Sequence, residues 1–301
     1  MLLNSAEEQK MKVLVTGSRG QVGRSLIEQL QTTQWELLAL DRQSLDITDA
    51  DQVFSTVLDF CPDVIVNTAA YTAVDQAESD RERAYAINRD GPENLAQAAS
   101  RCGAALLHIS TDYVYSGDGS ALYRETDTTN PQSVYGESKL AGEQRVAAAC
   151  DRHIILRTAW VFGEYGNNFV KTMLKLGRER QALSVVDDQL GGPTYAGDIA
   201  SALVVMVAKI ERGEALEWGI YHYSGFPHLS WYSFAAEIFE RAQASDLLSK
   251  IPSLSPIATS DYPTPAIRPA NSRLSCEKIT EKMSIPPSNW RAALDDLKAY
   301  C

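Results

Sequence analysis

The chain has 301 residues, 45% of them hydrophobic and 22% charged, a mixture that can bury a large core beneath a polar surface. With 28 Lys and Arg against 39 Asp and Glu, the formal net charge is -11, the wrong sign for binding nucleic acid. No run approaches the ~20 apolar residues that a membrane-spanning helix needs, and the five cysteines form no Cys-x-x-Cys pair. We therefore expect a globular cytoplasmic protein, with residues 1–10 outside its fold.

Short apolar runs alternate with helix-length stretches through the first half of the chain. The strand-like runs cover residues 12–16, 36–40, 63–67, 104–110 and 154–157, and helical spacing is clearest at 21–30, 81–100 and 136–149. This alternation predicts an α/β fold, a doubly wound parallel sheet of the Rossmann type with helices on both faces. The runs lack polar alternation, as expected of strands covered on both sides.

The sequence changes character after about residue 160, where irregular stretches and a proline-dense segment at 251–269 appear. We assign 11–160 mainly to a dinucleotide-binding domain. We assign 161–301 mainly to a smaller C-terminal substrate-binding lobe, with some segments returning to the Rossmann domain. Helices are expected in this half at 198–211, 231–244 and 290–300.

A glycine-rich turn follows the first predicted strand and opens the first predicted helix. It reads Gly17-Ser18-Arg19-Gly20-Gln21-Val22-Gly23. Glycines placed this way let backbone N–H groups approach a pyrophosphate at the helix N-terminus. A turn without a ligand is the alternative, and the strand-turn-helix setting argues against it. The G-x-x-G-x-x-G spacing is typical of the short-chain dehydrogenase superfamily.

The end of the second predicted strand carries two residues of opposite charge. Asp41 can accept hydrogen bonds from ribose hydroxyls and so favours NAD. Arg42, with Arg19 of the glycine turn, can neutralise the 2′-phosphate of NADP, although both arginines also fit a solvated surface. The sequence thus predicts NADPH or NADH as cofactor and leaves the choice open.

Tyr135 and Lys139 lie one helical turn apart and project from the same face of a predicted helix. An ammonium beside a phenol favours the ionised phenol, so Lys139 is expected to lower the pKa of Tyr135. Such pairs are common on exposed helices. Here, however, Ser110-Thr111-Asp112 ends the fourth strand, at the sheet edge where these folds bind ligands. Thr111 can hydrogen-bond the carbonyl oxygen that Tyr135 protonates, while the cofactor delivers hydride.

Longer segments carry a family resemblance from about Met11 to the C-terminal helix. The chain resembles an extended short-chain dehydrogenase/reductase and, within that superfamily, the dTDP-4-dehydrorhamnose reductases. The matching segments are 20–23 (GQVG), 66–75 (VNTAAYTAVD), 110–115 (STDYVY), 135–143 (YGESKLAGE), 157–161 (RTAWV), 166–169 (GNNF), 188–189 (DQ) with Gly191, 193–194 (PT), and 262–266 (YPTPA) with Arg268-Pro269.

The resemblance implies reduction of the 4-keto group of dTDP-4-dehydro-6-deoxy-L-mannose to dTDP-L-rhamnose, the last step of dTDP-rhamnose biosynthesis. It makes Tyr135 the proton donor, Lys139 its partner and a cofactor-ribose ligand, and Thr111 the residue that tunes Tyr135. The implied cofactor contacts are Gly20, Gln21, Val22, Asp41, Asp46, Ile47, Ala69, Ala70 and Tyr71, and the implied substrate contacts are Thr111, Asp112 and Trp160.

Arg268 is a further candidate, because a guanidinium fork suits the oxygens of a substrate pyrophosphate. A structural ion pair in the lobe is its alternative role. Trp160 likewise has two interpretations, since its indole could pack against the deoxysugar or belong to the core.

The resemblance also implies a homodimer, because some members dimerise through Mg²⁺ held by acidic side chains. Two of the matching positions here are Ser25 and Gly197, which supply no carboxylate. This departure argues against a Mg²⁺ site, and no metal is assigned.

Reduction of another sugar nucleotide is an alternative within the same class, and three other functions compete with a reductase. A sugar-nucleotide dehydratase needs a second carboxylate after Asp112, where the chain has Tyr113. A 4-epimerase uses the same Tyr and Lys but keeps its cofactor through the cycle. A non-catalytic regulatory subunit of a methionine adenosyltransferase shares the fold, and the intact Thr111, Tyr135 and Lys139 argue against it.

Overall fold

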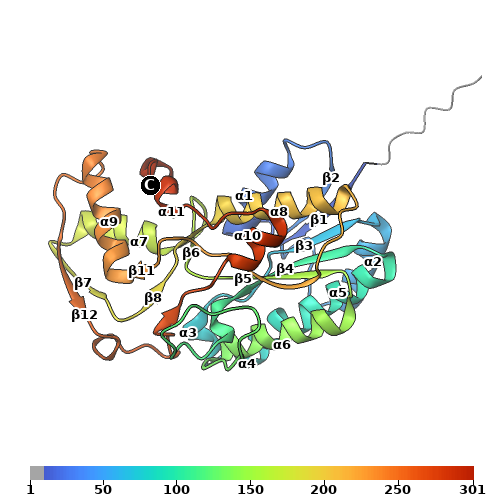
Figure 1. The fold of residues 1–301 in the computed structure, drawn as a ribbon, viewed down its shortest axis with the longest axis horizontal. Helices are drawn as coiled ribbons and strands as arrows, with labels where there is room; N and C mark the ends of the chain where they lie inside the picture. Colours follow the sequence, from blue (N-terminus) through green and yellow to red (C-terminus); the bar gives the residue numbers. More distant parts are fainter. Residues whose placement is uncertain (1–9) are drawn as a thin grey trace, which may run out of the picture.

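A computed structural model describes residues 10–301; residues 1–9, most of the segment expected outside the fold, lie beyond the described part. Its centre is a six-stranded parallel sheet with the order β10-β5-β4-β3-β1-β2 (Figure 1). This architecture confirms the predicted doubly wound α/β fold. The strands are β1 (Lys12–Thr16), β2 (Glu36–Leu40), β3 (Val64–Asn67), β4 (Ala105–Thr111), β5 (His153–Thr158) and β10 (Gly219–His222).

Helices cover both faces of the sheet, which explains why its strands are continuously apolar. Along β1, Val13 and Val15 pack beneath one helical layer, whereas Leu14 points into the other. The first layer contains α1 (Gln21–Leu30), α8 (Ala196–Glu211) and α10 (Glu277–Met283), and the second contains α2 (Ala50–Phe60), α5 (Gly91–Cys102) and α6 (Val134–Ala149).

The single helix predicted at 81–100 is divided in the structure. It consists of α4 (Arg81–Tyr85), a π-helical turn η1 (Ala86–Asp90) and α5. The π turn buries Asn88, whose amide donates to the carbonyl oxygen of Tyr71 and to the hydroxyl of Ser138. A wide turn of this kind re-aims a side chain within a helix, and helical periodicity alone does not reveal it.

Much of the second half of the chain forms the lobe at the carboxyl edge of the sheet (Figure 1). Its core gathers Phe162, Phe234 and Trp290. Helix α8 and strand β10, also from this half, lie in the sheet layers. The lobe elements are β6 (Val161–Phe162) paired with β9 (Thr194–Tyr195), β7 (Ala182–Val186) paired with β12 (Ser253–Ile257), the sheet β11 (Leu229–Ser230), β8 (Leu190–Gly191) and β13 (Asn271–Ser272), and helices α7 (Phe169–Glu179) and α9 (Trp231–Ala244).

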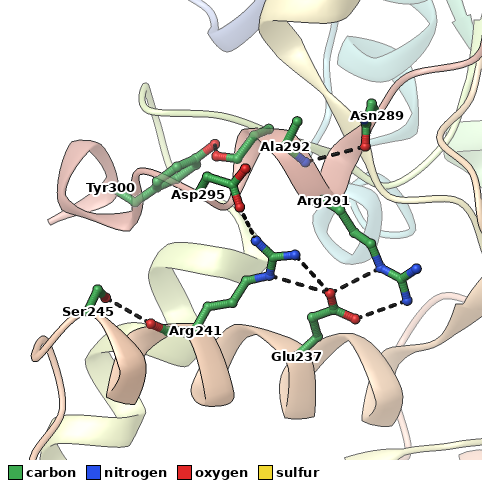
Figure 2. Close-up of polar contacts among 9 residues, drawn as sticks. Glu237, Arg241, Ser245, Asn289, Arg291, Ala292, Asp295 and Tyr300 are labelled. Carbon is green, nitrogen blue, oxygen red and sulfur yellow. Dashed lines mark hydrogen bonds and ion pairs between the residues drawn. The ribbon is translucent and has the colours of Figure 1, made fainter.

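The helix predicted at 290–300 is also interrupted, into α11 (Trp290–Ala293) and a 3-10 turn η4 (Leu297–Tyr300). Asp295 lies between them and pairs with Arg241 of α9 (Figure 2). Glu237, one turn earlier on α9, accepts from Arg241 and from Arg291. These ion pairs tie the end of the chain to α9.

Three short elements complete the chain: α3 (Val74–Ala77) and the 3-10 turns η2 (Asp112–Val114) and η3 (Thr259–Asp261). Across residues 10–301, no helix combines the length and the apolar character needed to cross a membrane.

Candidate active site

The glycine loop joins β1 to α1 and packs tightly against the loop after β3. Gly17 has a φ of +72°, and a Cβ there would lie 2.5 Å from the backbone nitrogen of Ala69. A Cβ at Gly23 would lie 2.3 Å from the carbonyl oxygen of Gly17. Both positions therefore require glycine. Helix α1 has no side-chain cap and no acidic residue in its first turn, which leaves its first N–H groups for an anion.

Asp41 follows β2 and holds its own loop in place. Its Oδ1 accepts from the Ser44 hydroxyl and from two backbone N–H groups, and its Oδ2 pairs with the Nε of Arg19 at 2.6 Å. The Ser44 hydroxyl is the largest influence that lowers the pKa of Asp41, so this group is a carboxylate near neutral pH. Arg42 is exposed beside it.

These residues line a cavity of about 450 Å³ along the ends of β1, β2 and β3. Its walls combine glycine-loop backbone, charged side chains and the loop after β3, which suits an adenine dinucleotide. Nine of the proposed cofactor contacts meet here: Gly17, Gly20, Asp41, Arg42, Asp46, Ile47, Ala69, Ala70 and Tyr71. Sequence reasoning missed Arg83 and Ile87 of the same wall, which come from the divided helix.

The other proposed cofactor contacts do not line this cavity. The Val22 side chain packs into the core. Gln21 accepts from the amide of Asn168 at 3.0 Å, which links α1 to the start of α7. Gly23 provides the close approach to Gly17. At the start of α1, these residues have their backbone N–H groups, not their side chains, available to a ligand.

Helix α6 carries Tyr135 and Lys139 and is docked by close backbone contacts. The Ser133 hydroxyl caps its N-terminus by accepting from the N–H of Gly136. A Cβ at Gly136 would lie 2.2 Å from the carbonyl oxygen of Tyr113, and one at Gly142 would lie 2.0 Å from that of Asn88. The two glycines thus let α6 lie directly on η2 and on the π turn.

The surroundings of Tyr135 differ from the expectation based on sequence. Burial raises the pKa of Tyr135, and a hydrogen bond with Thr111 lowers it by less. Lys139 is not among the groups that act on this phenol, because its Nζ donates to the carbonyl oxygen of Ile109 at 2.7 Å. The expected lowering by Lys139 is therefore absent here. A phenol with a raised pKa is protonated at neutral pH and ready to donate.

Lys139 and Asp112 are both buried, with exposed fractions of 2% and 4%. Burial lowers the pKa of Lys139 to about 8, opposed by Glu143 one turn further along α6. Burial raises the pKa of Asp112 to about 6. The Oδ1 of Asp112 accepts from the Thr111 hydroxyl, whereas its Oδ2 has no hydrogen-bond partner. A buried carboxylate oxygen without a partner is free for a ligand hydroxyl.

A second cavity, of about 470 Å³, opens between the carboxyl edge of the sheet and the lobe. The indole of Trp160 stacks on that of Trp231, with ring centroids 3.5 Å apart, and Phe169 packs on Trp231. Trp160 has a φ of +49°, an unusual conformation for a bulky residue. The cavity therefore has an aromatic wall built from three separate segments.

Arg268 lines the same cavity from the proline-dense segment. Its Nη2 pairs with the Oδ2 of Asp75 at 2.5 Å, and its Nη1 donates to the hydroxyl of Tyr113. This ion pair joins the lobe to the Rossmann half. Sequence reasoning assigned no site role to Asp75, Tyr113, Phe169 or Trp231. The first three lie inside matching segments, whereas only tertiary structure brings Trp231 here.

No three His, Cys, Asp or Glu side chains are grouped to hold a metal ion in residues 10–301. Ser25 donates to the carbonyl oxygen of Gln21 within α1, and the carbonyl oxygen of Gly197 accepts from the amide of Gln29. These contacts join α1 to α8.

A Rossmann sheet, a glycine loop, and Tyr and Lys one turn apart beside a strand-end Thr define an extended short-chain dehydrogenase/reductase. The model of the RmlD substrate binding domain family matches residues 11–300. A dTDP-4-dehydrorhamnose reductase of Aggregatibacter actinomycetemcomitans is 51% identical over 290 residues, 96% of this chain and 99% of that protein. The chain belongs to the dTDP-4-dehydrorhamnose reductase family.

Two solved structures of dTDP-4-dehydrorhamnose reductases resemble this fold over nearly the whole chain. The dTDP-4-dehydrorhamnose reductase of Clostridium acetobutylicum is 39% identical, with a TM-score of 0.88 over 96% of this chain and 98% of that chain. The Bacillus anthracis enzyme, solved in complex with NADP, is 37% identical, with a TM-score of 0.89 over 97% of this chain and all of that chain.

Proposed function

We propose that the chain reduces the 4-keto group of dTDP-4-dehydro-6-deoxy-L-mannose to dTDP-L-rhamnose, the last step of dTDP-rhamnose biosynthesis. The observation that supports this most is the grouping of the buried Thr111 and Lys139 with the half-buried Tyr135 at the carboxyl edge of the sheet, in a chain that also has a cavity lined by the glycine loop. NADPH or NADH supplies the hydride when bound. Homodimer formation and a cytoplasmic location belong to the same proposal.

In this proposal, Tyr135 gives its proton to the substrate oxygen that was the ketone. Its raised pKa keeps the donor protonated at neutral pH, and the hydrogen bond with Thr111 orients it. Asp112 accepts from a sugar hydroxyl through its unpartnered Oδ2. Lys139 positions the ribose of the cofactor, and the carbonyl oxygen of Ile109 holds its Nζ in place.

Binding is divided between the two cavities. The cavity beside the glycine loop binds the dinucleotide through Gly17, Gly20, Asp41, Arg42 and the Ala69-Ala70-Tyr71 loop. In the second, Trp160 packs against the apolar face of the deoxysugar, and Arg268 meets the pyrophosphate. The Asp75 carboxylate holds the Arg268 guanidinium ready for this contact.

A measurement of cofactor oxidation with enzymatically made dTDP-4-dehydrorhamnose tests the proposal. We expect stoichiometric release of oxidised cofactor and formation of dTDP-L-rhamnose. A 4-epimerase would interconvert sugar nucleotides without net oxidation of the cofactor. A regulatory subunit would oxidise no cofactor with any sugar nucleotide and would co-purify with a methionine adenosyltransferase.

A further inference from the structure

Behind Lys139, a chain of buried polar side chains runs across three strands of the sheet. It leads from Thr16 at the end of β1, through Asn67 of β3 and His108 of β4, to the Nζ of Lys139. All four side chains are at most 2% exposed. Polar groups buried this deeply cost free energy unless each is paired, so the direction of every hydrogen bond in the chain is constrained.

The side-chain amide of Asn67 has only one possible orientation, and this orientation sets the direction of the other hydrogen bonds. Its Oδ1 accepts from the Thr16 hydroxyl at 2.7 Å and from the backbone N–H of Ala69 at 3.0 Å. A backbone N–H can only donate, so the atom that faces it must be the amide oxygen. The Nδ2 of Asn67 therefore points away, toward the Nδ1 of His108 at 2.9 Å.

The amide in turn fixes the tautomer of His108. An NH₂ group can only donate, so Nδ1 of His108 must accept with its lone pair. Burial and the nearby Lys139 hold the pKa of His108 well below its usual range, so the ring is neutral. A neutral ring that accepts at Nδ1 carries its proton on Nε2, and Nε2 faces the Nζ of Lys139 at 3.5 Å.

We propose that Asn67 and His108 are positioning residues that keep an imidazole N–H directed at Lys139 and thereby stabilise the neutral amine of that lysine relative to its ammonium. A neutral amine can accept from this N–H through its lone pair while it still donates to the carbonyl oxygen of Ile109. An ammonium has no lone pair, so it cannot accept from the imidazole N–H, and the two donors face each other without a hydrogen bond. The backbone of the cofactor loop, through Ala69, thus sets the protonation of Lys139.

The remaining charged neighbours of Lys139 do not cancel this effect. Glu143, on the same helix, favours the ammonium. Its carboxylate is already held by the guanidinium of Arg157 from β5 and by the Ser110 hydroxyl from β4. His153 of β5 acts on His108 and lowers its pKa further, which keeps that ring neutral. Burial already lowers the pKa of Lys139 to about 8, against the opposing effect of Glu143, and the geometry of the His108 N–H acts in the same direction as burial.

This inference rests on the proposed function for its use in turnover. When Tyr135 gives its proton to the product oxygen, a phenolate remains and must regain a proton before the next cycle. The Lys139 ammonium, one helical turn from Tyr135 on α6, can supply that proton through an intervening hydroxyl or water and become the neutral amine, which is the form that the His108 N–H stabilises. The amine then takes up one proton from bulk solvent, so each cycle consumes one proton for each ketone reduced.

Nitrogen-15 NMR of the protein labelled at histidine tests the tautomer without any turnover. The chain has four histidines, and a His108→Gln variant assigns the resonance of His108. We expect Nδ1 in the chemical-shift range of an unprotonated nitrogen and Nε2 in that of a protonated one across neutral pH. A proton on Nδ1, or an imidazolium at neutral pH, would overturn the proposal whatever the enzyme's substrate.

The Asn67→Asp variant reverses the direction of the hydrogen bonds from residue 67 through His108 to Lys139, while the side chain keeps almost the same shape. A carboxylate oxygen in place of Nδ2 accepts from Nδ1–H, so Nε2 becomes an acceptor for the ammonium. We expect the alkaline limb of the kcat profile to move up by about one pH unit or more, together with a switched NMR tautomer. A switched tautomer with an unmoved limb would refute the link to Lys139. His228→Gln, which changes a half-buried histidine of the lobe that contacts neither His108 nor Lys139, is the matched control and should leave the limb in place.

Discussion

The two cavities differ in the residues that line them. The cofactor cavity is walled largely by backbone, small residues and charged side chains at the ends of three adjacent strands, all between residues 17 and 87. The cavity between sheet and lobe is lined by aromatic side chains together with aliphatic and polar ones and the Arg268–Asp75 ion pair, drawn from segments between residues 75 and 272. Because of this difference, we expect side-chain truncation to weaken substrate binding far more than cofactor binding. Variants should therefore separate the two binding steps.

The largest effect is expected at Tyr135, the proposed proton donor, which lies on α6 at the carboxyl edge of the sheet. Tyr135→Phe removes the proton donor and keeps the ring, which packs edge-on against Tyr113. We expect kcat to fall by ~10²–10⁴-fold while the Kd of the cofactor changes by less than about threefold. Steady-state kinetics and a fluorescence titration measure the two. Retention of more than about half of kcat in a variant with a native circular dichroism spectrum would remove Tyr135 from the mechanism.

Trp160→Ala should damage the aromatic cavity alone. The indole stacks on Trp231, so its loss removes one wall of the proposed sugar site. We expect kcat/KM for the sugar nucleotide to fall by roughly 2–3 kcal/mol through a raised KM, with cofactor affinity unchanged. Trp35→Ala is the matched control, because the Trp35 indole lies away from this cavity and donates to Glu211 at the end of α8. Equal losses of cofactor and sugar binding, with lower thermal stability, would instead make Trp160 a core residue.

The cofactor cavity should discriminate weakly between its two candidate ligands. Asp41 and the arginines at 19 and 42 line the same wall, and Arg19 already pairs with Asp41. We expect NADH and NADPH to give kcat/KM values within about tenfold, or ~1.4 kcal/mol. Steady-state kinetics with each cofactor measure this ratio. A preference above roughly a thousandfold would place one of these side chains away from the ribose.

The smallest effect is expected outside both cavities, at the ion-pair cluster of α9 and α11 (Figure 2). Glu237 is partly exposed and accepts from Arg241 and Arg291. Glu237→Gln should cost less than ~1 kcal/mol of unfolding free energy, because partly exposed pairs are screened by solvent. Thermal denaturation measures this change in stability. The Kd of the cofactor and the Kd of the sugar nucleotide should both stay at wild-type levels. A loss of several kcal/mol would show that this cluster, rather than the core around Phe234, holds the end of the chain.

Where sequence signals were local, the expectations were close. The helices at 21–30 and 231–244 have the predicted bounds, because apolar spacing and end signals lie within the segments themselves. The helix predicted at 81–100 was wrong in continuity, since Asn88 is buried against Tyr71 and Ser138 from distant segments. The electrostatic expectation for Tyr135 was also wrong, because burial, which no local pattern reports, raises the pKa of this phenol and Lys139 is not among the groups that act on it.

By itself, the sequence determined the doubly wound sheet, the glycine loop and the spacing of Tyr135 and Lys139, because each follows from neighbours along the chain. The tertiary structure alone decided that Trp231 joins Trp160, that Asp75 holds Arg268 and that His108 turns its N–H toward Lys139. These contacts depend on which side chains several strands and the lobe bring together, and on how deeply they are buried. Burial and hydrogen-bond direction set the chemistry of such groups, and both are properties of the packed molecule.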